Sequence, residues 1–313
     1  MRYIIKKTGI LIVTLLLISL LAFLAFQLIP GDPVTKLLGM DYTPERAASL
    51  REELGLNRNV FVRYCDWLTG FVTGDLGMSY SYSMGVSQVI EGKTAITAAL
   101  SLMAWFMVIA VSIPLGIGLA RYQGGRLDRA CVAMNQVFMA IPPFFIGILF
   151  TYLFGLVLNL FVPGKFVTFG ESFWGCLGYL FFPALAIAIP KIAMVTKLLR
   201  SSILQEMNKD YVRTAYSRGN TRWRVIHGHV LKNALLPVIT YTAMKLADIV
   251  AGSIVVEQVF VVPGLGRLLL SSIGNRDYPV AQYIVVIIAF VVVFMNYLAD
   301  VVVQYIDPRV RLG

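Results

Sequence analysis

The first long apolar run of the chain is Thr8–Ile29, TGILIVTLLLISLLAFLAFQLI, in which 22 consecutive residues carry no charge. As an α-helix this run is about 33 Å long, which matches the hydrocarbon thickness of a bilayer. Arg2, Lys6 and Lys7 precede it, as basic residues precede a secretory signal. However, the run is longer than the roughly 7–15 apolar residues of a signal peptide, and no small-x-small cleavage site follows. The sequence therefore predicts a permanent first transmembrane helix.

The composition extends this membrane assignment to the rest of the chain. Hydrophobic residues make up 58% of the 313 residues and charged residues 14%, against about 25% charged in soluble proteins. Five more apolar runs follow, at about 95–120, 130–160, 177–196, 237–262 and 280–303. The run at about 130–160 is too long for one straight span, and we expect Pro142-Pro143 to bend it. The fold class is predicted to be all-α, an integral membrane protein with six transmembrane helices.

Basic residues predict the orientation of these helices. With the N-terminus inside, the inner segments carry 16 Lys and Arg residues and the outer segments nine, six of which lie in the long first loop. Cytoplasmic segments of membrane proteins are enriched in Lys and Arg, so both termini are predicted to be cytoplasmic. The same rule accounts for the net charge of +10 without nucleic-acid binding.

The outer segment of about residues 30–93 is too long for a simple turn. Thr43 is placed to cap a helix that has Pro44 at its first position and ends near Gly55. Aromatic residues then follow at helical spacing, which suits an element on the membrane surface; they are Phe61, Tyr64, Trp67 and Phe71. The segment is either a structural cap, which we favour, or a direct substrate site.

Enzyme and metal chemistry lack their residues in this sequence. Gly92-Lys93-Thr94 ends like a phosphate-binding loop, but Ser87 stands where that loop needs its first glycine. His227 and His229 lie two positions apart, so on a helix they point about 200° from each other and do not chelate as an i, i+4 pair does. We expect no catalytic residue, no metal site and no cofactor on this chain.

Three cysteines, Cys65, Cys131 and Cys176, form no CxxC pair. A disulfide between Cys65 and Cys176 is the alternative to free thiols, because both cysteines are predicted to lie outside the membrane. We expect three free thiols.

The fifth apolar run contains ionisable residues, which are costly in a bilayer unless they pair or face a polar cavity. Lys245, Asp248 and Gly252 fall at i, i+3 and i+7, on one helical face. They form either a candidate pathway surface or a structural pair in which Lys245 extends toward the interface and Asp248 neutralises it. Glu257 is rotated by about 180° from Asp248 and is a candidate brace of an outer gate, with Arg267 as a partner.

The basic inner segment between the fourth and fifth runs predicts two capped helices. Asp210 is placed to N-cap a short helix, Tyr211–Arg218, that Gly219 ends. Asn220 or Thr221 then caps a second helix. The length and capping of this inner segment favour a docking site for a protein. The alternative is a connector that binds anionic lipid headgroups.

The short inner helix also carries a family signature. It reads Asp210-Tyr211-Val212-Arg213-Thr214-Ala215 and is followed by Gly219. This is similar to the E-A-A-x-x-x-G loop of permease subunits of ATP-binding-cassette (ABC) importers, with Arg213-Thr214-Ala215 in place of E-A-A. Further matching motifs are Gly31-Asp32-Pro33, Leu54-Gly55-Leu56, Gly74-Asp75-Leu76-Gly77, His229-x-Leu231-Lys232-Asn233-Ala234-Leu235-Leu236-Pro237, Val255-Val256-Glu257, Phe260-x-x-Pro263-Gly264-Leu265-Gly266-Arg267, Arg276-Asp277-Tyr278-Pro279 and Asp307-Pro308-Arg309. Over nearly its whole length the chain resembles the B-type (first) permease of the dipeptide, oligopeptide and nickel group.

The resemblance implies a type I ABC importer transmembrane fold in a bacterial-type cell (inner) membrane. Residues 1–93 would hold the first helix and the extracytoplasmic segment, residues 94–304 the permease domain, and residues 305–313 a cytoplasmic tail. The implied partners are a second homologous permease, two ATPase subunits that bind ATP and Mg, and an extracellular solute-binding protein. The coupling helix at Asp210–Gly219 would dock to the ATPase, and this chain would bind no nucleotide.

The solute and the mechanism keep alternatives. Di- and oligopeptides are the first expectation, and nickel or a metal chelate is the runner-up because Asp248 suits a peptide amino terminus or a cation equally. An ATP-independent secondary transporter would leave the large basic inner segment without a role. A scaffold or sensor protein would bind partners without moving a solute.

Overall fold

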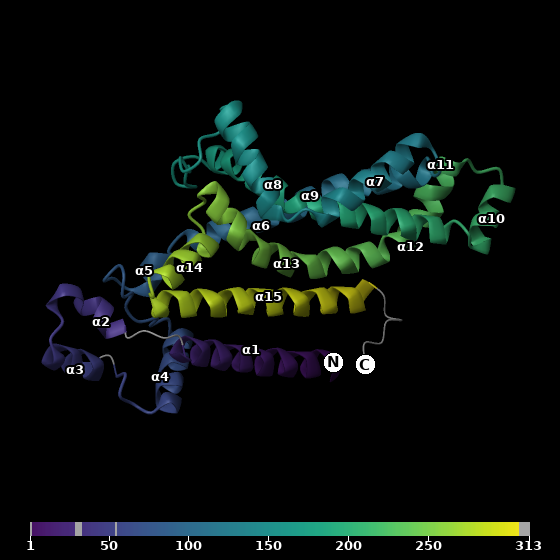
Figure 1. Ribbon diagram of the computed structural model, residues 1–313. Coiled ribbons are helices and arrows are strands. Elements are labelled where there is room, and N and C mark those ends of the chain that lie inside the picture. The colour runs from purple at the N-terminus through teal and green to yellow at the C-terminus, as the bar shows by residue number, and fades with distance from the viewer. Residues whose placement is uncertain (1, 29–32, 54, 307–313) are drawn as a thin grey trace. The chain divides into compact units, whose positions relative to one another are not determined.

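The computed structural model describes residues 2–28, 33–53 and 55–306, most of which are helical (Figure 1). Within these ranges there is no strand, and one isolated antiparallel bridge joins Met78 to Gly85. Residues Gly31 and Asp32, Leu54, the Asp307-Pro308-Arg309 motif and most of the predicted tail lie outside the described residues. The chain divides into two compact units, Met1–Ile96 with Pro263–Val293, and Thr97–Val262 with Phe294–Gly313.

The first unit combines the two ends of the sequence. It contains α1 (Arg2–Leu28), α2 (Pro33–Leu38), the 3-10 turn η1 (Gly39–Asp41), α3 (Pro44–Glu53), α4 (Val60–Thr73), α5 (Val86–Ile90), α14 (Leu265–Gly274) and the first part of α15 (Tyr278–Ile306).

Local capping residues define the helices of the outer segment. At α3, the Thr43 hydroxyl accepts a hydrogen bond from the Arg46 amide at 3.3 Å, which confirms the predicted start of this helix. At α4, Asn59 caps the first turn by accepting from the Phe61 amide at 2.8 Å. Gly74 ends α4 in the left-handed region with φ +87°, a conformation that favours glycine.

Two aromatic residues of α4, Tyr64 and Trp67, pack against α1. The ring centroids of Tyr64 and Phe23 are 5.5 Å apart in an edge-to-face arrangement. The Tyr64 and Ser19 hydroxyls are hydrogen-bonded at 2.8 Å. The predicted helical spacing of the aromatic residues is therefore confirmed, and Tyr64 and Trp67 join the outer segment to the first apolar helix.

A buried carboxylate at the start of α15 holds the loop that precedes α5. Asp277 is fully buried and accepts hydrogen bonds from the Ser79 hydroxyl at 2.5 Å and from the amides of Tyr80 and Ser81 at 3.1 and 3.2 Å. Three donors satisfy a carboxylate that would otherwise be costly to bury. Asp277 thereby connects two segments that lie almost 200 residues apart in the chain.

The second unit contains the remaining helices. They are α6 (Lys93–Arg121, from Thr97 onward), α7 (Arg126–Ala140), α8 (Pro143–Phe150), the π-helix η2 (Thr151–Val157), α9 (Phe173–Glu206), α10 (Asp210–Ser217), α11 (Arg222–Val225), the π-helix η3 (Ile226–Val230), α12 (Leu231–Ala234), α13 (Leu236–Phe260) and the end of α15.

Five described helices are long and apolar enough to span a membrane: Lys6–Leu28, Val86–Arg121, Phe173–Glu206, Leu236–Phe260 and Tyr278–Val301. Helix α7 is followed, after a sharp bend, by the continuous helix that α8 and η2 form. A sixth span results if these two helices are counted together as one membrane crossing. Helix α9 continues to Glu206, ten residues beyond its predicted run, because the charged residues at its end stay helical, whereas α6 differs from its run by at most two residues. The spans confirm five of the predicted segments to within a few residues at most of their ends.

The third predicted span bends sharply at Pro142-Pro143, which confirms the predicted bend. Arg126–Ala140 and Pro143–Val157 meet at 98°. Pro142 is extended (ψ 142°), as the residue before a proline prefers to be, and neither Pro142 nor Pro143 has an amide hydrogen to continue the helix. Two consecutive prolines therefore end one helix and start another.

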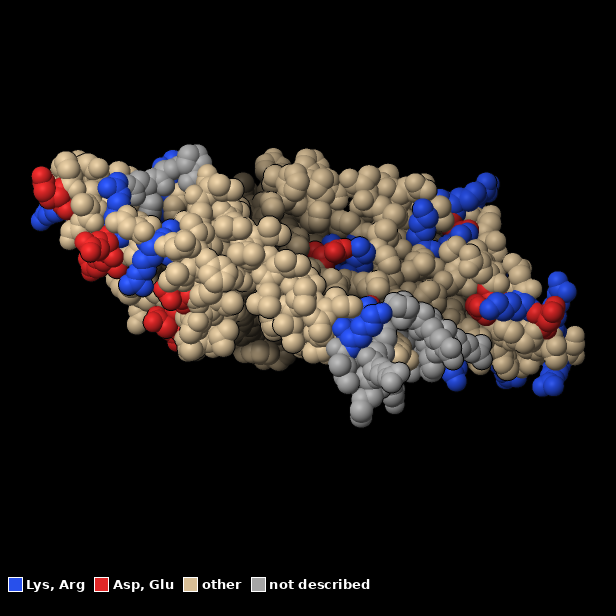
Figure 2. Space-filling view, turned by 90° about the horizontal axis from the view of Figure 1, so that it is seen from below, with Lys and Arg blue, Asp and Glu red and all other residues tan. Residues whose placement is uncertain are grey.

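Apolar side chains cover much of the surface as well as the core. Only 11% of the most apolar 18-residue stretch of α1 is buried. The face of the molecule shown in Figure 2 is largely uncharged. A soluble protein rarely exposes so much apolar surface, so lipid is the medium for it. In the second unit, a buried cluster from α6, α9, α10 and α11–α13 forms the core; it includes Ile117, Leu199, Ile203, Val212 and Ile226.

Candidate functional site

Helix α10 stands at the end of the second unit away from α8 and has two distinct faces (Figure 1). Val212 and Ala215 are buried, with 1% and 6% of their surface exposed, and belong to the core of the unit. The opposite face is exposed and polar; it consists of Asp210, Arg213, Thr214 and Ser217. One face of this eight-residue helix is therefore held by the core of the unit, and the other face is polar and open.

The two ends of α10 differ in how well the sequence predicted them. Asp210 is the first helical residue and not the N-cap, which is Lys209. The correction has a physical reason: at the first turn the Asp210 carboxylate interacts with the positive end of the helix dipole and lies 3.5 Å from the Arg213 guanidinium. At the other end, Gly219 has φ +81° and its amide donates to the Tyr216 carbonyl at 2.8 Å, which confirms the predicted stop.

The turn after α10 resolves the second predicted cap. Thr221, rather than Asn220, caps α11 by accepting from the Arg224 amide at 3.5 Å. Asn220 instead donates from its side chain to the Ala215 carbonyl at 3.0 Å, so it closes the end of α10.

A polar cluster ties α10 to the end of α9. Glu206 accepts from the Lys209 ammonium at 2.5 Å and from the Tyr211 hydroxyl at 2.7 Å, and Asn233 of α12 donates to Tyr211 at 3.4 Å. Burial raises the pKa of the Tyr211 hydroxyl, and its hydrogen bond to Glu206 raises this pKa further. Tyr211 therefore remains protonated and donates throughout the physiological range.

A second connection joins α11 to the end of α6. Arg222 donates to the Ala120 carbonyl at 3.1 Å. The Arg121 guanidinium lies 5.0 Å from the centre of the Trp223 ring. The centroids of the Trp223 and His227 rings are 3.5 Å apart, and the two rings are tilted by 42°. Sequence reasoning treated His227 only as a potential ligand. Among the described residues, no group of three or more His, Cys, Asp or Glu is placed to hold a metal ion.

A buried ion pair joins α7 to α9, and sequence reasoning missed it. Asp128 accepts from Arg200 Nε at 2.8 Å and Nη2 at 2.7 Å, and from the Gly124 amide at 2.9 Å. The Asp128 side chain is 3% exposed. The only signal in the sequence was a lone acid at the start of an apolar helix, which does not identify its partner.

The predicted face of α13 contains a charged cluster. Lys245 and Asp248 form an ion pair, and the Lys245 ammonium lies 5.3 Å from the centre of the Tyr241 ring. Lys191 of α9 interacts electrostatically with both Lys245 and Asp248. The Asp248 side chain is 54% exposed and the Lys245 side chain 33%. A Cβ added at Gly252 would meet nothing within 4 Å, so this face of α13 is open.

Glu257 lies elsewhere on α13 and is fully buried. It accepts from the Thr97 hydroxyl of α6 at 2.7 Å and from the Ser253 hydroxyl at 3.4 Å. The carboxyl group thus joins α6 to α13 within the second unit. Its predicted role as the brace of a gate with Arg267 stays a prediction.

The cysteines are free thiols in the structure. Cys65 is exposed, Cys131 half-buried and Cys176 buried. No disulfide joins Cys65 to Cys176.

Two known families of membrane transport components match the sequence of this chain. Residues 112–312 match the family described as binding-protein-dependent transport system inner membrane component, and residues 1–101 match the N-terminal region of the same kind of component. The first match alone covers more than half of the chain. The chain belongs to this inner membrane component family.

Relatives of this inner membrane component match it from end to end. A Brucella abortus (strain 2308) protein, whose given name is that of a peptide transport system permease protein, is 35% identical over 98% of both chains. The dipeptide transport system permease protein DppB of Escherichia coli (strain K12) is 32% identical over 99% of both chains. The α10 and α13 sites both lie inside these matches.

A solved structure supports the fold of the inner membrane component. A chain of the MetNI methionine ABC transporter, inward facing and in its CY5 native crystal form, superposes with a TM-score of 0.57 at 14% identity. The superposition covers 70% of this chain and 97% of that chain. The type I ABC importer transmembrane fold predicted above is confirmed, and the component is a multi-pass inner membrane protein.

Proposed function

We propose that this inner membrane component is the permease subunit of an ABC importer for di- and oligopeptides. It would form the pathway together with a second, homologous permease. Two separate ATPase subunits would supply the energy, and an extracellular solute-binding protein would deliver the peptide. The observation that carries the proposal is α10, whose buried face is fixed to the membrane helices while its polar face stays exposed.

The anchoring of α10 suggests how ATP hydrolysis is coupled to transport. An ATPase bound to the exposed face of α10 would move it when the ATPase pair closes. Glu206 and Tyr211 connect α10 to α9, and Arg222 connects α11 to α6. Movement of α10 would therefore displace two long membrane helices together. ATP and Mg bind to the partner subunits, and this chain performs no covalent chemistry.

The charged cluster on α13 is the proposed pathway surface. Within this chain, Asp248 is exposed and Lys245 half-buried on a membrane helix, which is costly unless a second permease or a hydrated solute faces them. Two lysines accompany one aspartate, so the cluster carries a surplus positive charge. That surplus suits the carboxylate of a peptide and opposes the passage of a bare divalent cation, which weighs against nickel.

The proposed orientation places α10 in the cytoplasm and the α2–α5 segment outside. An odd number of crossings separates these two segments if the bent α7–α8 pair counts as one span. They therefore lie on opposite sides of the membrane. The high density of Lys and Arg around α10 favours the cytoplasmic side for it. The functional division at residues 93 and 304 remains part of this proposal.

The test is ATP-driven uptake of a tripeptide in proteoliposomes that contain the four membrane and ATPase subunits and the binding protein. Arg213→Glu reverses a charge on the exposed face of α10 and is expected to reduce uptake at least about tenfold, because one charged contact at an interface contributes about 2 kcal/mol. Lys165→Glu reverses a charge at another exposed position and serves as the control. Normal uptake by Arg213→Glu would argue against docking at α10.

A further inference from the structure

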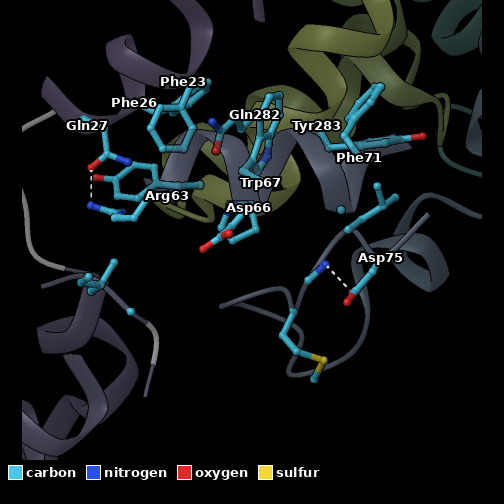
Figure 3. Close-up of a pocket in the computed structure, with 18 of the residues that line it drawn as sticks. Phe23, Phe26, Gln27, Arg63, Asp66, Trp67, Phe71, Asp75, Gln282 and Tyr283 are labelled. Carbon is cyan, nitrogen blue, oxygen red and sulfur yellow. Dashed lines mark hydrogen bonds between the residues drawn. The ribbon is translucent and has the colours of Figure 1, made fainter. Parts of the chain in front are cut away.

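The first unit encloses a cavity of about 660 Å³ that no function has so far been assigned to. Its walls come from the end of α1, from α4, from the loop that holds Asp75, and from the first two turns of α15 (Figure 3). The volume lies within the range of about 300–1,000 Å³ that small-molecule sites occupy.

Two hydrogen-bond donors in the cavity wall are unsatisfied. Gln282 is only 7% exposed, and its Nε2 is buried without a hydrogen-bond partner among the described residues. The Tyr278 hydroxyl lies four residues earlier, on the same face of α15, and is also buried without a hydrogen-bond partner among the described residues. In Figure 3 the Gln282 amide lies between the rings of Phe26 and Trp67. Buried donors of this kind nearly always have a partner, so a ligand with acceptor oxygens would satisfy them.

Charged groups of both signs line the same cavity. Arg63 donates to the Gln27 side chain at 3.0 Å, and Arg58 forms an exposed ion pair with Asp66 at 3.3 Å. Asp75 is the second acid and accepts from the Gly77 amide at 3.3 Å. Two cations and two anions leave the cavity neutral, which matches a zwitterion better than a ligand of a single charge.

Aromatic rings form the apolar part of the wall. Phe23 lies 5.9 Å from Trp67, and Trp67 lies 5.7 Å from Phe71, measured between ring centroids. Polar groups from Gln27, Asp66 and Gln282 alternate with these rings around the cavity (Figure 3). A lipid acyl chain needs a continuous apolar wall, whereas a short peptide carries polar backbone groups and apolar side chains in alternation.

We propose that this cavity binds a short zwitterionic peptide. Backbone or carboxylate oxygens of the peptide accept hydrogen bonds from Gln282 and Tyr278, and an apolar side chain packs against Trp67 and Phe71. This inference rests on the proposed function in that the solute is a peptide. It adds a binding site in the first unit of the permease to the surface proposed on α13.

The test is calorimetric titration of the full chain, assembled with its second permease in phosphatidylcholine nanodiscs, with the tripeptide Ala-Phe-Ala and without the binding protein. Gln282→Leu and Tyr278→Phe each remove one donor and keep the side-chain volume. Each is therefore expected to raise the dissociation constant for the peptide about fivefold. Tyr152→Phe removes an exposed hydroxyl outside the cavity and should bind as the unmodified chain does. Thermal unfolding of each variant shows whether the fold is kept.

Three results would overturn the inference: no saturable binding, equal binding by all variants, or co-purified phospholipid that is lost from Gln282→Leu. The last result would assign the cavity to lipid. Uptake of the same tripeptide by the complete transporter separates this inference from the proposed function. Uptake without binding in the cavity would reject only the cavity site, and absence of uptake by the unmodified transporter would reject the peptide function.

Discussion

Single residues hold the helices of this permease together through contacts that a sequence does not reveal. Asp128 and Arg200 are the clearest example, because the carboxylate is almost completely buried and its two oxygens face one guanidinium. Asp128→Ala is expected to destabilise the protein by about 3 kcal/mol, since it leaves the half-buried Arg200 guanidinium without its partner.

The matched control for this pair replaces both groups at once. Asp128→Leu combined with Arg200→Met removes both charges and keeps the volume, and should lose much less stability than Asp128→Ala. Thermal unfolding in detergent measures both. Equal losses in the single and double variants would mean that the ion pair is not what stabilises α7 against α9.

The charge of Asp248 also acts at the residue scale. Asp248→Asn leaves Lys245 and Lys191 without their acid, so we expect altered peptide selectivity and about tenfold slower uptake. Uptake of peptides with a free or an amidated carboxyl end measures the selectivity. An unchanged uptake profile for both peptides would favour a purely structural pair.

At the scale of elements, the close contact between α6 and α9 depends on a glycine. A Cβ at Gly116 would lie 2.9–3.0 Å from three side-chain atoms of the buried Leu199. Gly116→Ala is therefore expected to destabilise the protein by about 1–3 kcal/mol through overpacking. Gly118→Ala is the control on the same helix, because its Cβ would meet nothing within 4 Å, and it should stabilise by about 0.5–1 kcal/mol. Two shifts of the same sign in thermal unfolding would contradict the described packing.

The elements themselves were largely predictable because lipid imposes long charge-free runs and local caps mark helix ends. Thr43, Gly219 and Pro142-Pro143 act within a few residues of themselves, so the sequence indicated their effects. The partners of Asp128 and Lys191 depend on which helices pack together, which periodicity does not specify. The Asp210 cap was off by one residue because an acid is favourable both at the N-cap and in the first turn of a helix, so the sequence does not distinguish the two positions.

The cavity of the first unit was beyond sequence reasoning for a related reason. Trp67 and Phe71 were correctly placed on a helix, but Gln282 and Tyr278 come from the other end of the chain. Nothing in the spacing of these four residues indicates that α4 and α15 share a wall.

At the scale of the whole molecule, the account depends on α10 as the contact point of the ATPase. The direct measurement places a photo-reactive amino acid at Thr214, on the exposed face of α10, and irradiates the assembled, transport-active complex. The account expects a cross-link to the ATPase subunit from position 214 and none from the same group at Lys165. A complex that transports peptide while position 214 fails to cross-link to the ATPase, or cross-links no better than position 165, would contradict it.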